Sequence, residues 1–128
     1  MRNTRNDLPR FKDSFSLEKR LLESNRILEK YRDRIPCIIE IDRNSHLQLD
    51  KKKFLVPNDI TIGQFLYVVR KRVDVKKEES LFLFTNNILP PSSKLLLEIY
   101  KEYRDEDNFL YFILSSENTF GRIKKVKV

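Results

Sequence analysis

The sequence contains no tryptophan, one cysteine, one histidine and only two glycines in 128 residues. A single cysteine cannot form a disulfide within the chain, which favours a reducing compartment such as the cytosol or the nucleus. One histidine and one cysteine argue against a metal centre built on these ligands and against a Cys–His nucleophile pair. Two isolated glycines cannot form a Gly-rich phosphate-binding loop. These scarcities exclude the most common catalytic motifs.

The chain also lacks a long apolar stretch. Its longest run of hydrophobic residues covers residues 109–114, whereas a membrane-spanning helix needs about 20 residues. The polar and basic N-terminus predicts no secretory signal. With 40% hydrophobic and 35% charged residues, the composition suits one globular domain that buries roughly two thirds of its unfolded surface.

Positive charge is what the chain has in excess. The formal net charge is +7, which by itself suggests nucleic acid or an anionic membrane as a partner. The charge is unevenly distributed, because residues 122–128 carry four basic side chains and no acidic one. The rest of the chain has a net charge of only +3. More than half of the excess therefore follows Gly121, the second glycine.

Apolar periodicity predicts three helices. The first begins after Ser16, an acceptable N-cap, and ends before Pro36, because proline disfavours helical backbone in the residue before it. Its buried stripe is expected to comprise Leu17, Leu21, Leu28 and Tyr31, with Ile27 at the edge. The next helix starts at Thr61, where Gln64 completes a capping box, and its apolar positions are Ile62, Phe65, Leu66, Val69 and Val73. The last is expected to be capped by Ser92 or Ser93, and the acidic residues 105–107 that follow it are predicted to form a solvated turn.

Alternating side chains predict four strands, at residues 35–41, 53–57, 81–85 and 109–115. The core face of the first strand is expected to comprise Ile35, Cys37, Ile39 and Ile41, with Pro36, Ile38 and Glu40 opposite. Strand 53–57 is expected at an edge of the sheet, because Pro57 cannot donate a ladder hydrogen bond and three lysines precede Phe54. The last strand is apolar on both faces, which is typical of a central strand.

The order of these elements predicts the fold class. Residues 1–15 are expected to form an arm or a short helix, and helix, strand, strand, helix, strand, helix and strand then follow. Two strands joined by a short polar connection favour a hairpin, and the later strands complete the sheet. The sequence therefore predicts an α+β fold with a four-stranded mixed sheet, and it suits a β-grasp domain with added N-terminal helices.

No group of residues predicts an active site, because no nucleophile, base and orienting group can be assembled. His46 lies in a polar loop, and Cys37 is expected to be a small core hydrophobe. The basic run 51–53 has three interpretations. It can protect an edge strand against aggregation, bind nucleic acid together with the basic run 70–72, or recognise an extended acidic peptide that adds to the sheet edge.

Several motifs carry a resemblance to a known family. They are EKR (18–20), KYRDRIP (30–36), DKKKFLVP (50–57), TIGQF (61–65), RKR (70–72), LFLFTNNILPP (81–91), DEDNFLY (105–111) and FG (120–121). With them the chain resembles the autophagy-related ubiquitin-like modifiers of the GABA-receptor-associated-protein type, over about residues 11–121. The resemblance implies a ubiquitin-like β-grasp fold with additional N-terminal helices, and a protein that is not an enzyme.

The resemblance also implies a C-terminal modification. Family members are cut after a terminal glycine by a cysteine protease, pass through activating and conjugating enzymes as thioesters, and end as amides on phosphatidylethanolamine. Here Phe120 and Gly121 would close a ubiquitin-like domain of residues 16–121, and Arg122 would begin a removed extension, 122–128. Glycine suits this role because it lacks a Cβ and its carbonyl is open to attack. Covalent phosphatidylethanolamine on Gly121 is expected, and no other cofactor.

The resemblance further implies a peptide groove for cargo receptors that carry W/F/Y-x-x-L/I/V motifs. Residues three apart in an extended peptide point to opposite faces, so two pockets are needed. The implied aromatic pocket comprises Glu23, Ile27, Pro36, Ile38, Lys53, Leu55 and Phe109. The implied aliphatic pocket comprises Phe54, Val56, Pro57, Ile60, Phe65, Val68 and Val69. Acidic residues flanking the motif would meet Arg34, Lys51, Lys53 and Arg72.

Together these observations predict a modifier that acts in autophagosome formation and cargo capture. It would be cytoplasmic, and it would lie on autophagosomes and other intracellular membranes when lipidated. Two alternatives stay open at this point: a non-conjugated trafficking adaptor that uses the same groove, and a basic nucleic-acid-binding domain. Nucleic acid is not expected as a partner, since the mature chain would lose four of its positive charges.

Overall fold

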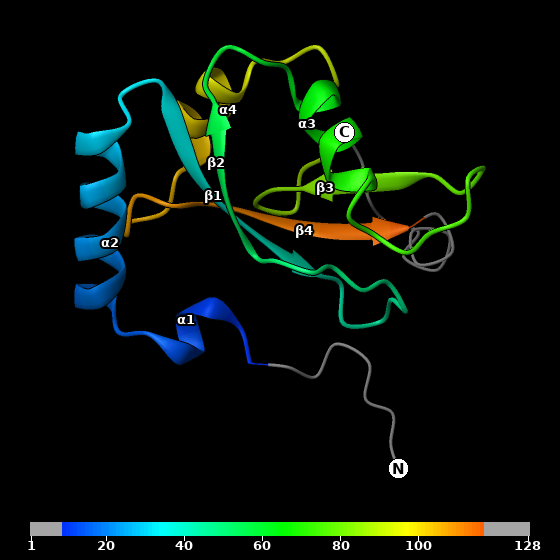
Figure 1. Cartoon of the computed structure of the whole chain (residues 1–128), viewed down its shortest axis with the longest axis horizontal. Coiled ribbons are helices and arrows are strands. Elements are labelled where there is room, and N and C mark those ends of the chain that lie inside the picture. Colours follow the sequence, from blue (N-terminus) through cyan, green and yellow to red (C-terminus); the bar gives the residue numbers. More distant parts are fainter. Residues whose placement is uncertain (1–8, 117–128) are drawn as a thin grey trace.

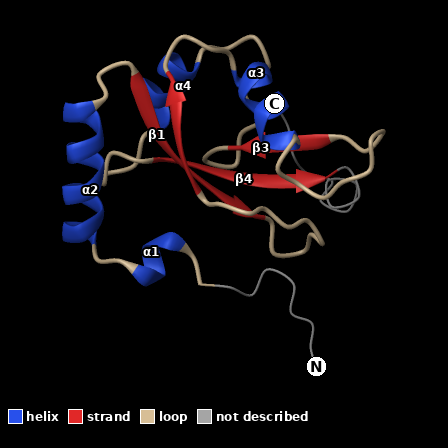
Figure 2. Cartoon of the chain, in the orientation of Figure 1, coloured by secondary structure: helices blue, strands red, loops and turns tan. Residues whose placement is uncertain are grey.

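The computed structural model describes residues 9–116. The helices are α1 (Phe11–Ser14), α2 (Leu17–Lys30), α3 (Ile62–Arg70) and α4 (Leu96–Tyr103), and the strands are β1 (Arg34–Ile41), β2 (Lys53–Pro57), β3 (Leu81–Phe84) and β4 (Leu110–Ser116). The strands form one sheet, with α1 and α2 on one side of it and α3 and α4 on the other (Figure 1). The described chain is thus a three-layer α+β arrangement, as Figure 2 shows by element type.

The sheet has the order β2-β1-β4-β3. β1 pairs with β2 in antiparallel fashion and with β4 in parallel, and β3 is antiparallel to β4. Cys37 therefore lies opposite Phe54 on one side and Leu110 on the other. The mixed sheet, the β1–β2 hairpin and the edge position of residues 53–57 confirm the predictions from the sequence.

Side-chain alternation divides the apolar residues of the sheet between two clusters. The main core lies under α3 and α4, where Phe65 packs edge-on against Phe54 at a centroid distance of 5.7 Å and lies 5.8 Å from Phe112. A smaller cluster of Phe11, Ile38 and Phe109 lies on the opposite face. Cys37 is fully buried in the main core, and burial raises the pKa of its thiol. This confirms Cys37 as a small hydrophobe.

α3 starts as the sequence predicted. The Thr61 hydroxyl accepts a hydrogen bond from the Gln64 amide at 3.1 Å, and the Gln64 side-chain oxygen accepts one from the Thr61 amide at 2.9 Å. The Gly63 amide donates to the Ser92 carbonyl at 2.9 Å. A Cβ at Gly63 would lie only 3.1 Å from that oxygen, so glycine permits this close approach. Val73 was expected on the same helix but lies beyond its end and forms an isolated β-bridge with Leu49.

The predicted caps of α4 are wrong. The N-cap is Leu95, whose amide donates to the Glu98 carboxylate at 3.0 Å. Neither Ser92 nor Ser93 caps the helix, because the backbone of this segment is already engaged with the start of α3 through the Gly63–Ser92 hydrogen bond. The helix therefore begins three residues after the second serine, once the chain has left that contact.

The predicted burial of α2 is also wrong in part. Leu17 and Tyr31 are exposed, whereas the buried side chains of this helix are Arg20 and Ser24. The reason is a buried carboxylate on the facing loop. Asp107 was expected in a solvated turn but has 0% exposure, so α2 turns polar side chains toward it.

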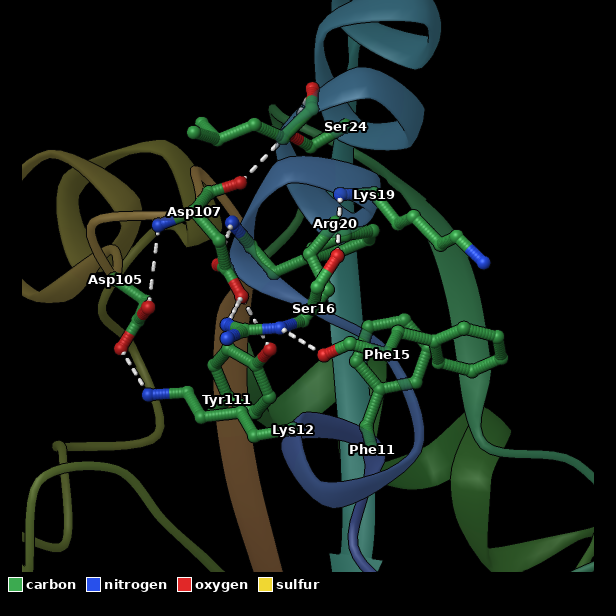
Figure 3. Close-up of polar contacts among 12 residues, drawn as sticks. Phe11, Lys12, Phe15, Ser16, Lys19, Arg20, Ser24, Asp105, Asp107 and Tyr111 are labelled. Carbon is green, nitrogen blue, oxygen red and sulfur yellow. Dashed lines mark hydrogen bonds and ion pairs between the residues drawn. The ribbon is translucent and has the colours of Figure 1, made fainter.

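Asp107 holds α2 to the sheet through a set of hydrogen bonds (Figure 3). One carboxylate oxygen accepts from the Arg20 guanidinium at 2.6 Å and from the Tyr111 hydroxyl at 2.5 Å. The other accepts from the Phe109 amide at 2.9 Å. The Ser24 hydroxyl donates to the Asp107 carbonyl at 2.6 Å. Both carboxylate oxygens and the backbone carbonyl of Asp107 therefore accept at least one hydrogen bond.

The same network fixes the link between α1 and α2. The Arg20 Nε donates to the Phe15 carbonyl at 3.0 Å, so one guanidinium joins this link to the loop before β4. Burial, and then the hydrogen bond to Asp107, raise the pKa of Tyr111, which keeps its phenol protonated as a donor. A buried ion pair is favourable only when hydrogen bonds satisfy its other polar atoms. Here both carboxylate oxygens of Asp107 and the Nε of Arg20 have such partners.

We expect Arg20→Met to lower the free energy of unfolding by about 3–5 kcal/mol, because the loss of one partner leaves the other charge buried and unpaired. Urea denaturation measures this change. Glu106→Gln is the matched control, since this exposed residue lies in the same loop, and it should change stability by less than about 0.5 kcal/mol. Equal effects of the two substitutions would contradict a structural role for the pair.

Candidate peptide-binding site

The residues implied for the aromatic pocket lie together on the sheet face that α1 and α2 cover. Ile38 pairs with Lys53 and Pro36 with Leu55 across the β1–β2 ladder, and side chains opposite each other share a face. Ile38 and Phe109 belong to one buried cluster, against which Ile27 packs from α2. Three members are buried, namely Pro36, Ile38 and Phe109, and four are half-buried, namely Glu23, Ile27, Lys53 and Leu55. The first group forms a floor and the second a rim.

An ion pair closes this rim. The Lys53 ammonium contacts the Glu23 carboxylate, which joins β2 to α2 across the pocket. Burial lowers the pKa of Lys53, because partial removal from water disfavours the charged ammonium. The ammonium also lies 5.9 Å from the ring centroid of Phe11. An incoming aromatic side chain would therefore meet a partly desolvated cation at the pocket mouth, a favourable contact for a π face.

The residues implied for the aliphatic pocket lie toward α3, on the face of β2 opposite to Lys53 and Leu55, except for Pro57 at the end of the strand. Four of them are part of the main core and are buried, namely Phe54, Val56, Phe65 and Val69. Pro57 and Ile60 are half-buried, and Val68 is 46% exposed. These three line a hollow of about 640 Å³ together with Tyr67 and Gln64. The core residues therefore support the pocket from below, and only the outer three can touch a ligand directly.

The structure places the predicted charge contacts around β2. The Arg34 guanidinium donates to the Leu55 carbonyl at 3.3 Å. The Lys51 ammonium lies 4.7 Å from the Phe54 ring centroid. Arg72 pairs with Asp50 at 3.1 Å. Cations thus gather beside the edge strand, where they can meet acidic residues of a peptide without occupying either pocket.

Two further residues contribute to these two surfaces and are not predicted from the sequence. Phe11 lies in the segment 1–15, for which the sequence predicts only an arm or a short helix, yet it is buried against Ile38 and Phe109. The signal was Phe15 four residues later, the spacing at which helical side chains meet. Tyr67 precedes Val68 and lines the same hollow while 64% exposed, but it lies outside the set of apolar positions that periodicity assigned to this helix.

Other kinds of site find no support within residues 9–116. No group of three or more His, Cys, Asp or Glu side chains in this part of the chain could hold a metal ion. No helix of the same residues has the length and apolar character needed to cross a membrane. The predicted conjugation residues Phe120, Gly121 and Arg122 lie outside the described residues.

Comparison with known proteins extends the resemblance over most of the chain. Residues 19–121 match the family described as "Autophagy protein Atg8 ubiquitin like". Autophagy-related protein 8 of Schizosaccharomyces pombe is 54% identical over 114 residues, which cover 88% of this chain and 94% of that protein. Autophagy-related protein 8 of Pichia angusta is 48% identical over 118 residues, which cover 91% and 94%.

Solved structures agree in fold as well as in sequence. Trypanosoma brucei ATG8 superposes with a TM-score of 0.81 at 43% identity, covering 87% of this chain and 97% of that one. Plasmodium falciparum Atg8, solved in complex with a Plasmodium falciparum Atg3 peptide, gives a TM-score of 0.76 at 35% identity, covering 85% and 99%. These matches confirm the predicted ubiquitin-like fold. The chain therefore belongs to the Atg8 family of autophagy ubiquitin-like proteins, which are modifiers and not enzymes.

Proposed function

We propose that this chain is conjugated through Gly121 to phosphatidylethanolamine and recruits cargo receptors with W/F/Y-x-x-L/I/V motifs to the forming autophagosome. The main support for peptide binding is that β2 is an edge strand with different side chains on its two faces. Lys53 and Leu55 face one side of this strand and Phe54 and Val56 the other, and a hollow lined by Pro57, Ile60 and Val68 lies beside the second side. An extended ligand beside β2 would present alternate side chains to both pockets.

The direction of each anchor follows from this arrangement. The aromatic anchor would enter between α2 and β2, beside the Lys53 ammonium and above Ile38 and Phe109. The aliphatic anchor would enter the hollow of Pro57, Ile60 and Val68. Backbone hydrogen bonds to the edge strand would supply affinity that does not depend on sequence, and the two pockets would supply specificity.

Cations beside β2 favour acidic peptides. Arg34, Lys51 and Arg72 flank the strand, so acidic residues next to the motif would speed the encounter and fix the register. Several basic side chains are paired with acids inside the chain, namely Arg72 with Asp50, Lys12 with Asp105 and Arg20 with Asp107. This internal pairing favours an acidic peptide over nucleic acid, which requires a continuous basic surface.

The conjugation half of the proposal rests on family membership and on where the match ends. The family match covers residues 19–121 and stops at Gly121, which leaves the basic residues 122–128 beyond it. We infer that a cysteine protease removes this extension and that activating and conjugating enzymes then act on the glycine. Because a Plasmodium falciparum relative was solved with an Atg3 peptide, we infer that this chain also binds a peptide of an Atg3 homologue. The lipidated form would lie on autophagosomes and other intracellular membranes, and the free form would be cytoplasmic.

Leu55→Ala and Val68→Ala should each weaken the binding of a W-x-x-L peptide about tenfold, because each removes apolar contact from one pocket. Isothermal titration calorimetry measures the affinity. Leu22→Ala is the matched control, since this leucine is 61% exposed on α2 and takes no part in the groove. Equal affinity for all three variants would rule out the groove assignment.

Gly121→Ala should block both removal of residues 122–128 and attachment of the lipid. Intact mass spectrometry of the chain recovered from starved cells measures both, and the unsubstituted chain is expected to end at Gly121 and to carry a phospholipid. Val126→Ala lies inside the extension and serves as the control that is still processed. A full-length, unmodified chain in the unsubstituted sample would instead support the non-conjugated adaptor.

A further inference from the structure

Phe11 of α1 packs against the floor of the aromatic pocket from outside the groove. Its side chain is only 6% exposed and shares a buried cluster with Ile38 and Phe109, which are both fully buried. Its ring meets the Phe109 ring edge-on, with centroids 5.3 Å apart. Two of the three members of this cluster thus belong to the floor of the proposed pocket, and the third is a residue of the N-terminal helix α1.

The position of Phe11 is fixed from several directions. Its backbone amide donates a buried hydrogen bond of 2.6 Å to the Glu40 carboxylate on β1. The ring of Phe15 lies 5.1 Å away and that of Tyr111 6.4 Å away, centroid to centroid. The Lys52 ammonium donates to the Pro9 carbonyl at 3.1 Å just before the helix. These contacts therefore resist a displacement of Phe11 if a ligand presses Phe109 toward α1.

This packing limits how far the floor can recede. Phe109 and Ile38 are fully buried in the free chain, so a large aromatic side chain gains depth only if they move. Phe109 cannot move toward α1 while the Phe11 ring lies against it, because protein interiors are close-packed. An indole needs more depth than a phenyl ring, so this constraint acts on tryptophan more than on phenylalanine.

We infer that Phe11 is a specificity-determining residue: its ring sets the depth of the aromatic pocket and so the preference between tryptophan and smaller aromatic anchors. The inference rests on the proposed peptide groove. It assigns a role in ligand selection to a residue of α1 that does not line the groove. A smaller side chain at this position lets Phe109 recede and shifts the preference toward tryptophan.

The test compares two acidic peptides that differ only in the anchor, W-x-x-L and F-x-x-L, on the full chain with and without Phe11→Leu. The ratio of the two dissociation constants, Kd for the Phe peptide over Kd for the Trp peptide, should rise at least about threefold, since small changes in pocket volume discriminate ligands by tenfold or more. Phe15→Leu is the matched control. Its ring touches Phe11 but is 46% exposed, so the ratio should stay at the unsubstituted value.

The ratio of the two dissociation constants distinguishes a change in anchor preference from a general loss of structure, which would weaken both peptides equally. Equal weakening of both peptides would show a purely structural role and overturn the inference, and so would a ratio matching that of Phe15→Leu. If the unsubstituted chain binds neither peptide, the groove itself fails, which is a different result from an unchanged ratio. Should thermal unfolding show that Phe11→Leu does not fold, Phe11→Met has a similar volume on a longer, unbranched side chain that adapts to irregular gaps, and it must meet the same threefold criterion.

Discussion

The buried carboxylate of Asp107 is the contact on which the arrangement of the candidate groove depends. The carboxylate pairs with Arg20 of α2, and the backbone carbonyl of the same residue accepts from Ser24. Asp107 has 0% exposure, so an unpaired charge there would be strongly unfavourable. By fixing α2 over this face of the sheet, the network holds Glu23 and Ile27 opposite β2. The aromatic pocket exists only while that helix stays in place.

The opposite face of β2 is stabilised by a different kind of interaction. Here apolar burial dominates, because Phe54 and Val56 insert into the main core beside Phe65 of α3. The Thr61–Gln64 capping box fixes where α3 begins, and Gly63 lets it approach the Ser92 backbone. One edge strand is therefore supported by an ionic network on one face and by a packed core on the other. In the proposed binding mode, that asymmetry would offer an extended ligand two unlike pockets.

Local patterns made much of this predictable. Alternation of side chains predicted that Cys37 and Ile38 lie on opposite faces of β1. The Thr61–Gln64 pattern predicted the capping box at the start of α3. The docking of α2 could not be foreseen, because Arg20 and Asp107 are 87 residues apart and periodicity carries no information about which charges will pair. The start of α4 was not predictable for a related reason, since a long-range backbone hydrogen bond from Gly63 engages Ser92 at the start of α3. Within the groove, the sequence identified the strand and its two faces, but only packing distinguishes a lining residue such as Val68 from a supporting one such as Phe54.

A double-mutant cycle between peptide anchors and pocket residues tests the two-sided edge most directly. In the W-x-x-L peptide, either the Trp anchor or the Leu anchor is replaced by alanine. Each peptide variant is combined with Leu55→Ala and with Val68→Ala in the chain, which gives four pairs. The account predicts a coupling energy of at least about 0.5 kcal/mol for Trp with Leu55 and for Leu with Val68. The crossed pairs should couple less. Crossed coupling as strong as the direct coupling would contradict a ligand that places its two anchors on opposite faces of β2.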